Sequence, residues 1–396
     1  MMNGNPEIAF VIPRYGPEIL GGAEIHCRWI AERLAKRFSV EVLTTCAKDA
    51  VHWENHYSAG DHIINGLPVK RFSLSSRDKE RFEVLDCRRQ FNFSGLDETE
   101  EREWLRHMGP YSQDLLDYLQ IHSEDYACFI FFTYLFPTSV FGSRIVADKT
   151  FLVPTVHDEP YIYLPVYDDL FRAARGIFFN CEEEREFTLN RFPDATGKHV
   201  VVGCGINYPD HPKDSSRFRK RYGIDKPYIV YVGKIDPGKG CDHLVEYFER
   251  YIRDSRRDIQ LLLLGSGKME IAKHLGIRAV GPVSEEDKYS LLAEAEVLVN
   301  PSQNESLSLA LLESWAMGTP VLVNGKCGAM MGQCKRSNGG LWYENYSEFK
   351  GCLDWFFNYP QLSRKLAKGG KYYLESRYNW PVIEEKYLSL IGEYLR

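Results

Sequence analysis

Two series of short apolar segments run along the chain and constrain its fold more than any other feature. The first series comprises residues 8–12, 40–44, 128–132, 151–156, 176–179 and 200–202, and the second comprises residues 228–232, 259–264, 297–300 and 320–323. Both are rich in β-branched and aromatic residues and are apolar at successive positions, which is typical of parallel strands with helices on both faces. The pattern predicts two parallel sheets, one after the other.

Longer segments with helical periodicity separate the predicted strands. Between the first two, Cys27, Ile30, Leu34 and Phe38 recur at the spacing of one helix face. A strand, a helix and a second strand form the βαβ unit of a parallel sheet. Because 396 residues also exceed the size of one ordinary domain, we predict an α/β chain with two Rossmann-like domains.

The break between the two series indicates the domain boundary. Residues 207–222 are polar, charged and contain prolines, so we predict domains at 1–206 and 207–379. Residues 73–112 show no clean strand–helix alternation and are expected to form a helical insertion in the first domain. Residues 380–396 are expected to form an amphipathic helix that joins the first domain.

Composition narrows the class of protein. A formal net charge of −6 argues against a nucleic-acid partner. The ten cysteines are scattered without a CxxC pair, which favours free thiols in a reducing compartment over disulfides or a zinc site. The N-terminus shows no signal-peptide pattern, and the longest apolar segment, 129–136, is far shorter than the roughly 20 residues that span a bilayer. We expect a cytoplasmic protein.

Polar and glycine-rich segments follow several predicted strands, where ligands bind in open parallel sheets. After the first strand, Gly21 and Gly22 open a helix, and glycines there let a phosphate approach the free amides. A tight turn without a ligand explains this pair equally well, because the GxGxxG fingerprint is absent. His157 follows another strand beside Asp158 and Glu159. It is suited to a reacting centre, although a lone histidine is more often a structural hydrogen-bonding group.

The second domain opens with a glycine-rich turn that carries two lysines. Gly233 and Lys234 follow the strand directly, and Lys239 comes five residues later. Two lysines in such a turn are suited to a diphosphate, whereas surface lysines usually bind nothing specific. The sequence is not a Walker loop, which has the pattern GxxxxGK[ST]. Gly265 follows the next strand in a second turn that permits close approach.

The segment 300–320 carries two glutamates, Glu305 and Glu313, with apolar residues between them. Ser302 and Glu305 match a capping box at a helix start, which would leave Glu313 as a solvated helical residue. The apolar surroundings favour a buried Glu313 instead, and a buried carboxylate needs a partner. If both glutamates lie on one helix, about 12 Å separates them along its axis. That distance suits a sugar at one end and a ribose at the other.

In this order, the motifs resemble those of glycosyltransferase family 4, the group 1 retaining enzymes with the GT-B fold, over nearly the whole chain. The matched elements are the two glutamates with seven residues between them (305 and 313) and the Gly-x-Pro ending at 318–320, VGK…KG at 232–240, Gly-Gly-x-Glu at 21–24, His-Asp at 157–158 and the linker at 203–207. The resemblance implies two Rossmann-like domains that face each other across a deep cleft. It also implies transfer of a hexose-type sugar from a nucleotide-diphosphate sugar to a hydroxyl group in bacterial-type glycan or polysaccharide assembly.

The resemblance also implies roles for single residues. Lys234 and Lys239 would neutralise the donor diphosphate, and His157 would lie beside the reacting carbon. Glu305 would contact the donor sugar and Glu313 the ribose. The remaining donor-binding residues would be Gly21, Gly22, Gly233, Gly265, Ser306, Leu307, Ser308 and Leu309. No metal and no cofactor are expected.

The expected donor is a UDP- or GDP-sugar, and the expected acceptor is a glycan or a lipid-linked glycan. Aromatic and basic residues within 46–125 suggest peripheral contact with the inner face of a membrane. The chain departs from the family at Ser306 and Ser308, where the family has glycine, and at Lys234, which replaces an arginine. A nucleotide-sugar epimerase or phosphorylase of the same fold and a non-catalytic sugar-nucleotide-binding protein are the alternatives.

Overall fold

The computed structural model describes residues 8–91, 95–212, 216–267, 269–271 and 276–395. The chain divides into two compact units. Unit 1 comprises Met1–Cys204 and Ile383–Arg396, and unit 2 comprises Gly205–Val382. The boundary expected after residue 206 lies two residues from this division. The expectation of no signal peptide concerns residues 1–7, which lie outside the described residues.

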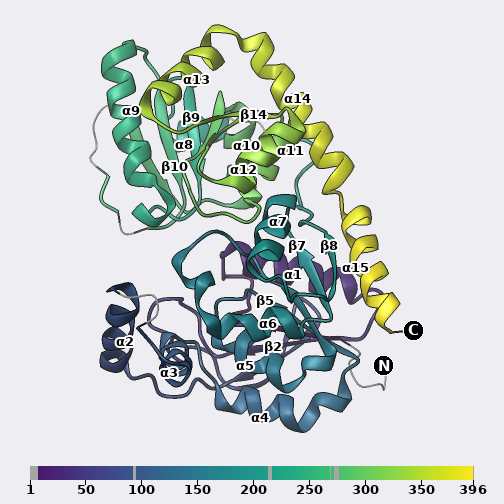
Figure 1. Cartoon of the computed structure of the whole chain (residues 1–396). Helices are drawn as coiled ribbons and strands as arrows, with labels where there is room; N and C mark the ends of the chain where they lie inside the picture. The colour runs from purple at the N-terminus through teal and green to yellow at the C-terminus, as the bar shows by residue number, and fades with distance from the viewer. Residues whose placement is uncertain (1–7, 92–94, 213–215, 268, 272–275, 396) are drawn as a thin grey trace. The chain divides into compact units, whose positions relative to one another are not determined.

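Unit 1 is built on a sheet of eight strands in the order β3-β4-β2-β1-β5-β6-β7-β8. All neighbours pair in parallel except β3 and β4, which are antiparallel. Strands β2, β5, β7 and β8 of this sheet are labelled in Figure 1. The strands are β1 (Ile8–Ile12), β2 (Val40–Thr45), β3 (Gly60–Ile64), β4 (Leu67–Phe72), β5 (Cys128–Phe132), β6 (Thr150–Val153), β7 (Gly176–Phe179) and β8 (Lys198–Val201). Because β1, β5, β6 and β7 are buried along their whole length, they form the core of the unit.

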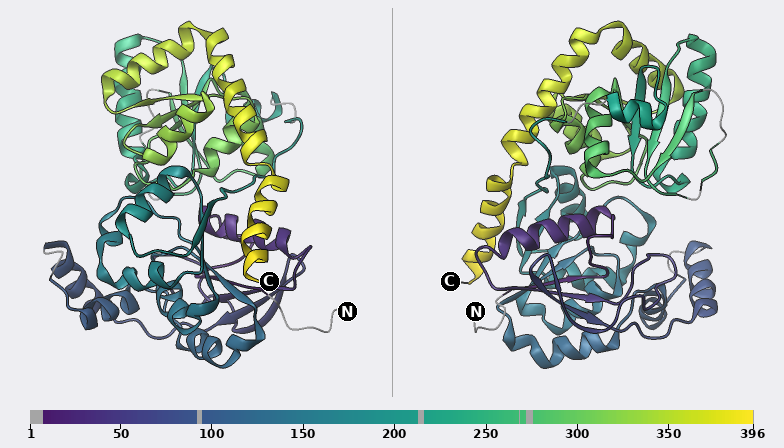
Figure 2. Two further views of the ribbon diagram at one scale, coloured as in Figure 1. Left: turned by 45° about the vertical axis from the view of Figure 1, so that its right-hand side comes forward. Right: turned by 180° about the vertical axis from the view of Figure 1, so that it is seen from behind.

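The helices of unit 1 connect these strands and include the expected helical insertion. They are α1 (Gly22–Leu34), α2 (Lys79–Phe91), α3 (Glu98–Met108), α4 (Gln113–His122), α5 (Pro137–Ile145), α6 (Asp168–Ala173) and α7 (Glu182–Arg191). Helices α2 and α3, which follow β4 in the chain, pack on each other (Figure 2). An Asp97–Glu100 capping box starts α3.

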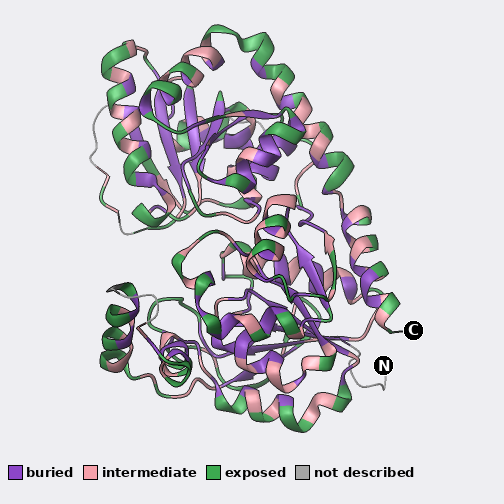
Figure 3. Cartoon of the chain, viewed as in Figure 1, coloured by how far each residue is buried: buried purple, intermediate pink, exposed green. Residues whose placement is uncertain are grey.

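Unit 2 has a fully parallel sheet of six strands in the order β11-β10-β9-β12-β13-β14. The strands are β9 (Tyr228–Val232), β10 (Gln260–Leu264), β11 (Ile277–Gly281), β12 (Val297–Asn300), β13 (Val321–Asn324) and β14 (Gly340–Tyr343). The helices are α8 (Ser216–Tyr222), α9 (Cys241–Ser255), α10 (Glu285–Glu294), α11 (Leu309–Ala316), α12 (Gly328–Ser337), α13 (Tyr346–Asn358) and α14 (Pro360–Arg377). In both units the buried residues lie in the sheet and on the helix faces that cover it (Figure 3).

The last helix, α15 (Trp380–Tyr394), begins in unit 2 and continues in unit 1 from Ile383. In unit 1, the Tyr387 ring packs on Phe178 with 4.3 Å between ring centroids, and its hydroxyl lies 3.3 Å from His26 Nε2. Both His26 and Tyr387 are buried. Burial lowers the pKa of His26 to about 3, so this imidazole is neutral. The apolar side of α15 therefore completes the core of unit 1.

The α/β class and the two Rossmann-like units agree with the sequence prediction. Every predicted strand is present, with ends shifted by up to three residues. Strands β3, β4, β11 and β14 were missed: all four are partly exposed, the first three are interrupted by polar or charged residues, and β14 is only four residues long. All ten cysteines are free thiols, and eight are buried. No helix among the described residues is both long and apolar enough to cross a membrane.

Candidate functional site: the switch point of unit 2

The strand order of unit 2 defines one position where loops leave the sheet in opposite directions. The chain proceeds from β9 through β10 to β11 on one side, and β12, β13 and β14 follow on the other side. Strands β9 and β12 are neighbours, so the loops after them diverge at the carboxyl edge of the sheet. Ligands of open α/β sheets bind at such a switch point. The predicted residues Lys234, Lys239 and Glu305 all lie in these two loops.

Glycines let the loops at this edge approach each other closely. Gly240 has φ +72°, and a Cβ there would lie 2.7 Å from the Pro301 carbonyl oxygen of the β12 loop. Gly265 has φ +142°, and a Cβ there would lie 1.9 Å from the Gly233 carbonyl oxygen. These positions therefore exclude side chains for steric reasons. The expected close approach at Gly233 and Gly265 occurs between two turns of the protein itself.

The two loops place a lysine against a glutamate. Lys239 Nζ lies 2.7 Å from Glu305 Oε1, and its side chain is 37% exposed. Burial lowers the pKa of Lys239, but the neighbouring acidic groups, Glu305 first and then Asp236, together raise it more, so the net direction is upward. Lys234 pairs with Asp236 at 2.6 Å and is 66% exposed. Asp236 also accepts a hydrogen bond from the Lys239 backbone amide and so fixes the turn.

The helix after β12 starts later than the capping box predicted. Helix α11 begins at Leu309 with Ser308 as its N-cap, so Glu305 lies in the preceding loop. The Ser302 hydroxyl bonds to Asn304 within this loop instead of capping a helix. The capping-box interpretation is wrong, and the helical estimate of about 12 Å between the glutamates does not apply. Leu307 and Ser308 are buried, whereas Ser306 and Leu309 are partly exposed.

Glu313 is buried, as its apolar surroundings predicted, and its partner is a residue that the sequence did not indicate. Lys288 Nζ lies 2.8 Å from Glu313 Oε1 and also bonds to the exposed Glu285. Burial raises the pKa of Glu313, and the Lys288 charge limits this rise. Lys288 lies on α10, so the pair ties α10 to α11. The reading of Glu313 as a solvated residue is therefore wrong.

Three amide side chains hold the Glu305 loop in place, and no pattern in the sequence indicated them. Asn300 Nδ2 donates to Ser308 Oγ at 3.0 Å, and Asn324 Nδ2 donates to the Pro301 carbonyl at 2.9 Å. From α12, Gln333 Nε2 donates to the Leu307 carbonyl at 2.6 Å. The loop conformation thus depends on three residues from three different elements.

Gly21 and Gly22 stand at the start of α1 in unit 1, as the sequence predicted. Gly21 is the N-cap with extended backbone, and a Cβ at Gly22 would meet no atom within 4 Å. Glu24 in the first turn pairs with Arg14 from the loop after β1. The space at Gly22 is compatible with a ligand near the first amides of α1.

His157 follows β6 at the carboxyl edge of the sheet of unit 1. Its Nε2 lies 3.3 Å from Glu159 Oε2, and the Tyr134 hydroxyl donates to Glu159 Oε1 at 2.5 Å. The preceding loop is held by Glu184, whose carboxylate accepts from the backbone amides of Val156, at 2.6 Å, and Asn180. Glu184 is buried. Its place in the sequence, beside Glu182 and Glu183, does not distinguish it from a solvent-exposed carboxylate.

Comparison with known proteins gives a consistent picture. Residues 213–372 match the family model of glycosyl transferases group 1. An uncharacterized glycosyltransferase of Methanocaldococcus jannaschii is 24% identical over 364 residues, which cover 85% of this chain and 84% of that protein. The D-inositol 3-phosphate glycosyltransferase of Geodermatophilus obscurus is 35% identical over 179 residues, which cover 39% of each chain. The chain therefore aligns with less than half the length of this second relative.

Two solved structures resemble the chain over nearly its full length. Sucrose-phosphate synthase from Thermosynechococcus elongatus has a TM-score of 0.71 at 18% identity, covering 98% of both chains. Anabaena HepE in complex with UDP-glucose has a TM-score of 0.69 at 16% identity, covering 98% of this chain and 100% of that chain. Both likenesses concern the fold, which is the GT-B fold of two Rossmann-like domains. The match of residues 213–372 to the family model and the Methanocaldococcus jannaschii relative support a glycosyltransferase of group 1.

Proposed function

We propose that the protein is a retaining glycosyltransferase that moves a hexose-type sugar from a nucleotide-diphosphate sugar to a hydroxyl acceptor without a metal ion. The observation that carries this proposal is the Lys239–Glu305 pair at the switch point of unit 2. A cation there meets the diphosphate, and the adjacent carboxylate meets the hydroxyl groups of the donor sugar. The two groups thus match two neighbouring parts of one ligand.

The leaving nucleotide diphosphate gains negative charge as the bond to the sugar breaks. Lys239 and the exposed Lys234 supply positive charge at this edge, and the first amides of α11 add the positive end of a helix dipole. Such fixed charges stabilise a developing anion strongly where water is excluded. In this proposal the two lysines and the helix amides take the place of a metal ion, and the acceptor attacks from the face that the diphosphate leaves.

Glu305 and Glu313 have different surroundings and therefore different proposed roles. Glu305 is partly exposed and faces Lys239, as a group that binds sugar hydroxyls would. Glu313 is buried, and Lys288 pairs with its Oε1. A ribose contact would therefore use a carboxylate whose position this ion pair fixes. The roles of Gly21, Gly22 and His157 in unit 1 stay predictions that rest on the family resemblance.

UDP-sugars are the first donors to test, because Anabaena HepE has been solved in complex with UDP-glucose. We propose a glycan or lipid-linked glycan as the acceptor and assembly of a glycan or polysaccharide as the setting. Peripheral association with a membrane remains part of this proposal.

A thermal-shift panel of UDP-, GDP- and ADP-sugars identifies the donor, and NMR of the anomeric proton then follows the sugar into the product. The expected result is stabilisation by one nucleotide series and a product with the donor's anomeric configuration. An epimerised sugar nucleotide formed from donor alone would replace the proposal with an epimerase. Glu305→Ala is expected to abolish transfer, and unchanged transfer would remove Glu305 from the site.

A further inference from the structure

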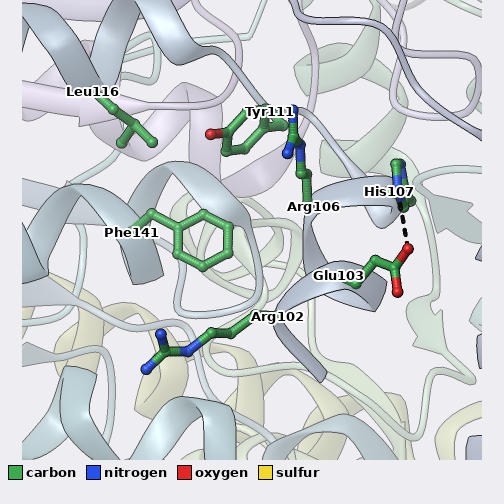
Figure 4. A pocket seen from close by; sticks show the side chains of 7 residues that line it. All are labelled: Arg102, Glu103, Arg106, His107, Tyr111, Leu116 and Phe141. Atoms are coloured by element: carbon green, nitrogen blue, oxygen red, sulfur yellow. Dashed lines mark ion pairs between the residues drawn. The ribbon is translucent and has the colours of Figure 1, made fainter. Parts of the chain in front are cut away.

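The helical insertion of unit 1 forms one wall of an open pocket that none of the motifs involves. It has a volume of about 410 Å³ and is lined by Arg102, Glu103, Arg106, His107, Tyr111, Leu116 and Phe141 (Figure 4). This volume lies within the range of roughly 300–1,000 Å³ that small-molecule sites occupy. A second pocket of about 670 Å³ shares Arg106 and His107 and continues along residues 76–80.

The pocket lies on the side of the sheet where a substrate of unit 1 is expected. Helix α4 leads into β5 and α5 follows it, so α4 begins and α5 begins at the carboxyl edge of the sheet. Tyr111 directly precedes the N-cap of α4, and Phe141 lies about one turn into α5. The pocket is therefore close to the edge that also carries His157 and Gly22.

The charges around the pocket do not cancel. Its single acidic residue, Glu103, accepts two hydrogen bonds from Arg81, at 3.0 and 2.6 Å, and this pairing lowers the pKa of Glu103. Arg102 pairs with Glu98, whose side chain is 76% exposed, and an exposed pair of this kind is weak. Among the described residues, no carboxylate pairs with Arg106. The Arg106 guanidinium therefore remains for an external anion, and Arg102, whose guanidinium points away from that of Arg106 in Figure 4, adds positive charge at the other end of the pocket.

The other wall is aromatic. The Arg106 guanidinium lies 4.7 Å from the centre of the Tyr111 ring, and this contact orients the plane in which its N–H donors lie. Tyr111 and Phe141 meet edge to face, with 5.9 Å between ring centroids. Aromatic rings offer apolar surface to the C–H faces of a sugar, while Arg106 meets its charged group.

We propose that this pocket binds a saccharide that carries an oxyanion, a phosphate or a carboxylate, as the acceptor or part of it. The proposal rests on the glycosyltransferase function proposed above. A planar guanidinium pairs with either oxyanion through two parallel hydrogen bonds. The neighbouring pocket along residues 76–80 gives room for further sugar units.

Calorimetry on the full-length protein tests the proposal with glucose 6-phosphate, glucuronate, glucose and inorganic phosphate as probes. Saturable binding of glucose 6-phosphate or glucuronate, with much weaker binding of glucose, is expected, and the tighter of the two names the oxyanion. Arg106→Gln should weaken that binding about tenfold or more, because it removes charged hydrogen bonds. Phe141→Leu should weaken the binding of the anionic sugar more than it weakens the binding of inorganic phosphate.

Arg37→Gln is the matched control, because Arg37 is exposed in the same unit before β2, at the amino edge of the sheet. Equal losses for Arg37→Gln and Arg106→Gln, or no binding of either anionic sugar, would overturn the proposal. Inorganic phosphate that binds as tightly as glucose 6-phosphate would also overturn it, because a sugar contact is then missing. UDP binding, measured in parallel, reports on unit 2: if UDP binds while the anionic sugars do not, only the acceptor pocket fails.

Discussion

Ser308 and Lys239 lie in neighbouring loops at the switch point of unit 2. One has a strained backbone, and the other carries a charge that is paired with the first loop. Ser308 has φ +68°, a conformation that is costly for a residue with a side chain, and it holds this conformation while accepting a hydrogen bond from Asn300. Lys239, from the neighbouring loop, is fixed against Glu305. Both features depend on the loop after β12, which hydrogen bonds from Asn300, Asn324 and Gln333 hold in place.

Replacing Ser308 by glycine and by alanine separates the strain from the hydrogen bond. Both variants remove the hydroxyl that accepts from Asn300, but only glycine relieves the positive φ. We expect the free energy of unfolding of Ser308→Gly to be about 1 kcal/mol higher than that of Ser308→Ala. Urea denaturation of the two variants measures this difference. Equal stabilities would show that Ser308 is not strained.

Lys239→Ala is expected to weaken UDP binding about 10- to 100-fold, the effect of losing a charged hydrogen bond. The substitution also leaves the Glu305 carboxylate facing the diphosphate without its cation. Lys234→Ala should weaken UDP binding less, about fivefold at most, because that lysine is 66% exposed. Calorimetric titration measures both variants, with Lys226→Ala as a control at the amino end of β9. Equal affinity for Lys239→Ala and the wild type would remove Lys239 from the donor site.

At the scale of elements, single buried carboxylates connect segments that are distant in sequence. Glu313 ties α11 to α10 through Lys288. Glu184, at the start of α7, accepts hydrogen bonds from the loop after β6 and the end of β7. Burial raises the pKa of Glu184 to about 8, against the opposing effect of these amides. We therefore expect the stability of the His157 loop to depend on the protonation of Glu184.

Glu184→Gln tests this connection. A raised pKa in the folded state means that the contribution of Glu184 to stability is fully present below about pH 4.5 and is lost as the pH rises through about 8. Glutamine does not titrate, and its NH₂ group cannot accept from the backbone amides. We expect Glu184→Gln to be destabilised by about 1–3 kcal/mol, with a smaller difference from the wild type at pH 8.5 than at pH 5.

Urea denaturation of both proteins at the two pH values measures the difference. An equal gap at pH 5 and pH 8.5 would show that the pKa of Glu184 in the folded protein is not raised above that of a free glutamate. In that case the backbone amides at least offset the effect of burial.

At the scale of the whole molecule, the chain folds as two units, and its end belongs to the first. Ile383, Tyr387 and Ile391 of α15 are fully buried within unit 1. The sequence predicted this return through the amphipathic pattern and the family resemblance. The expected cytoplasmic location and membrane contact stay predictions.

A chain that ends at residue 382 should therefore lose stability in unit 1. Burying a large apolar side chain contributes about 1.5–3 kcal/mol, and the truncation removes several. Hydrogen exchange should rise in β7 and α1, while β10 and β13 of unit 2 stay protected. A chain that ends at Tyr394 serves as the control. An equal rise in both units would contradict the division into two units.

The α/β class, the fully buried strands of both sheets and the positions of the glycine turns could be predicted from the amino-acid sequence. These are local properties: a continuous apolar run specifies a buried strand, and a glycine after it specifies a turn. The partly exposed strands β3, β4, β11 and β14 escaped because their pairing, not their composition, makes them strands.

Only the tertiary structure decided which charges meet. Glu305 was expected on a helix and lies in the loop before α11, where Lys239 faces it from the β9 turn. Lys288, Gln333 and Glu184 carried no signal, because a buried polar side chain is recognised by its partner, and the partner lies on another element. The spacing of residues along the chain does not contain this information, since the distance between two loops depends on the order of the strands in the sheet.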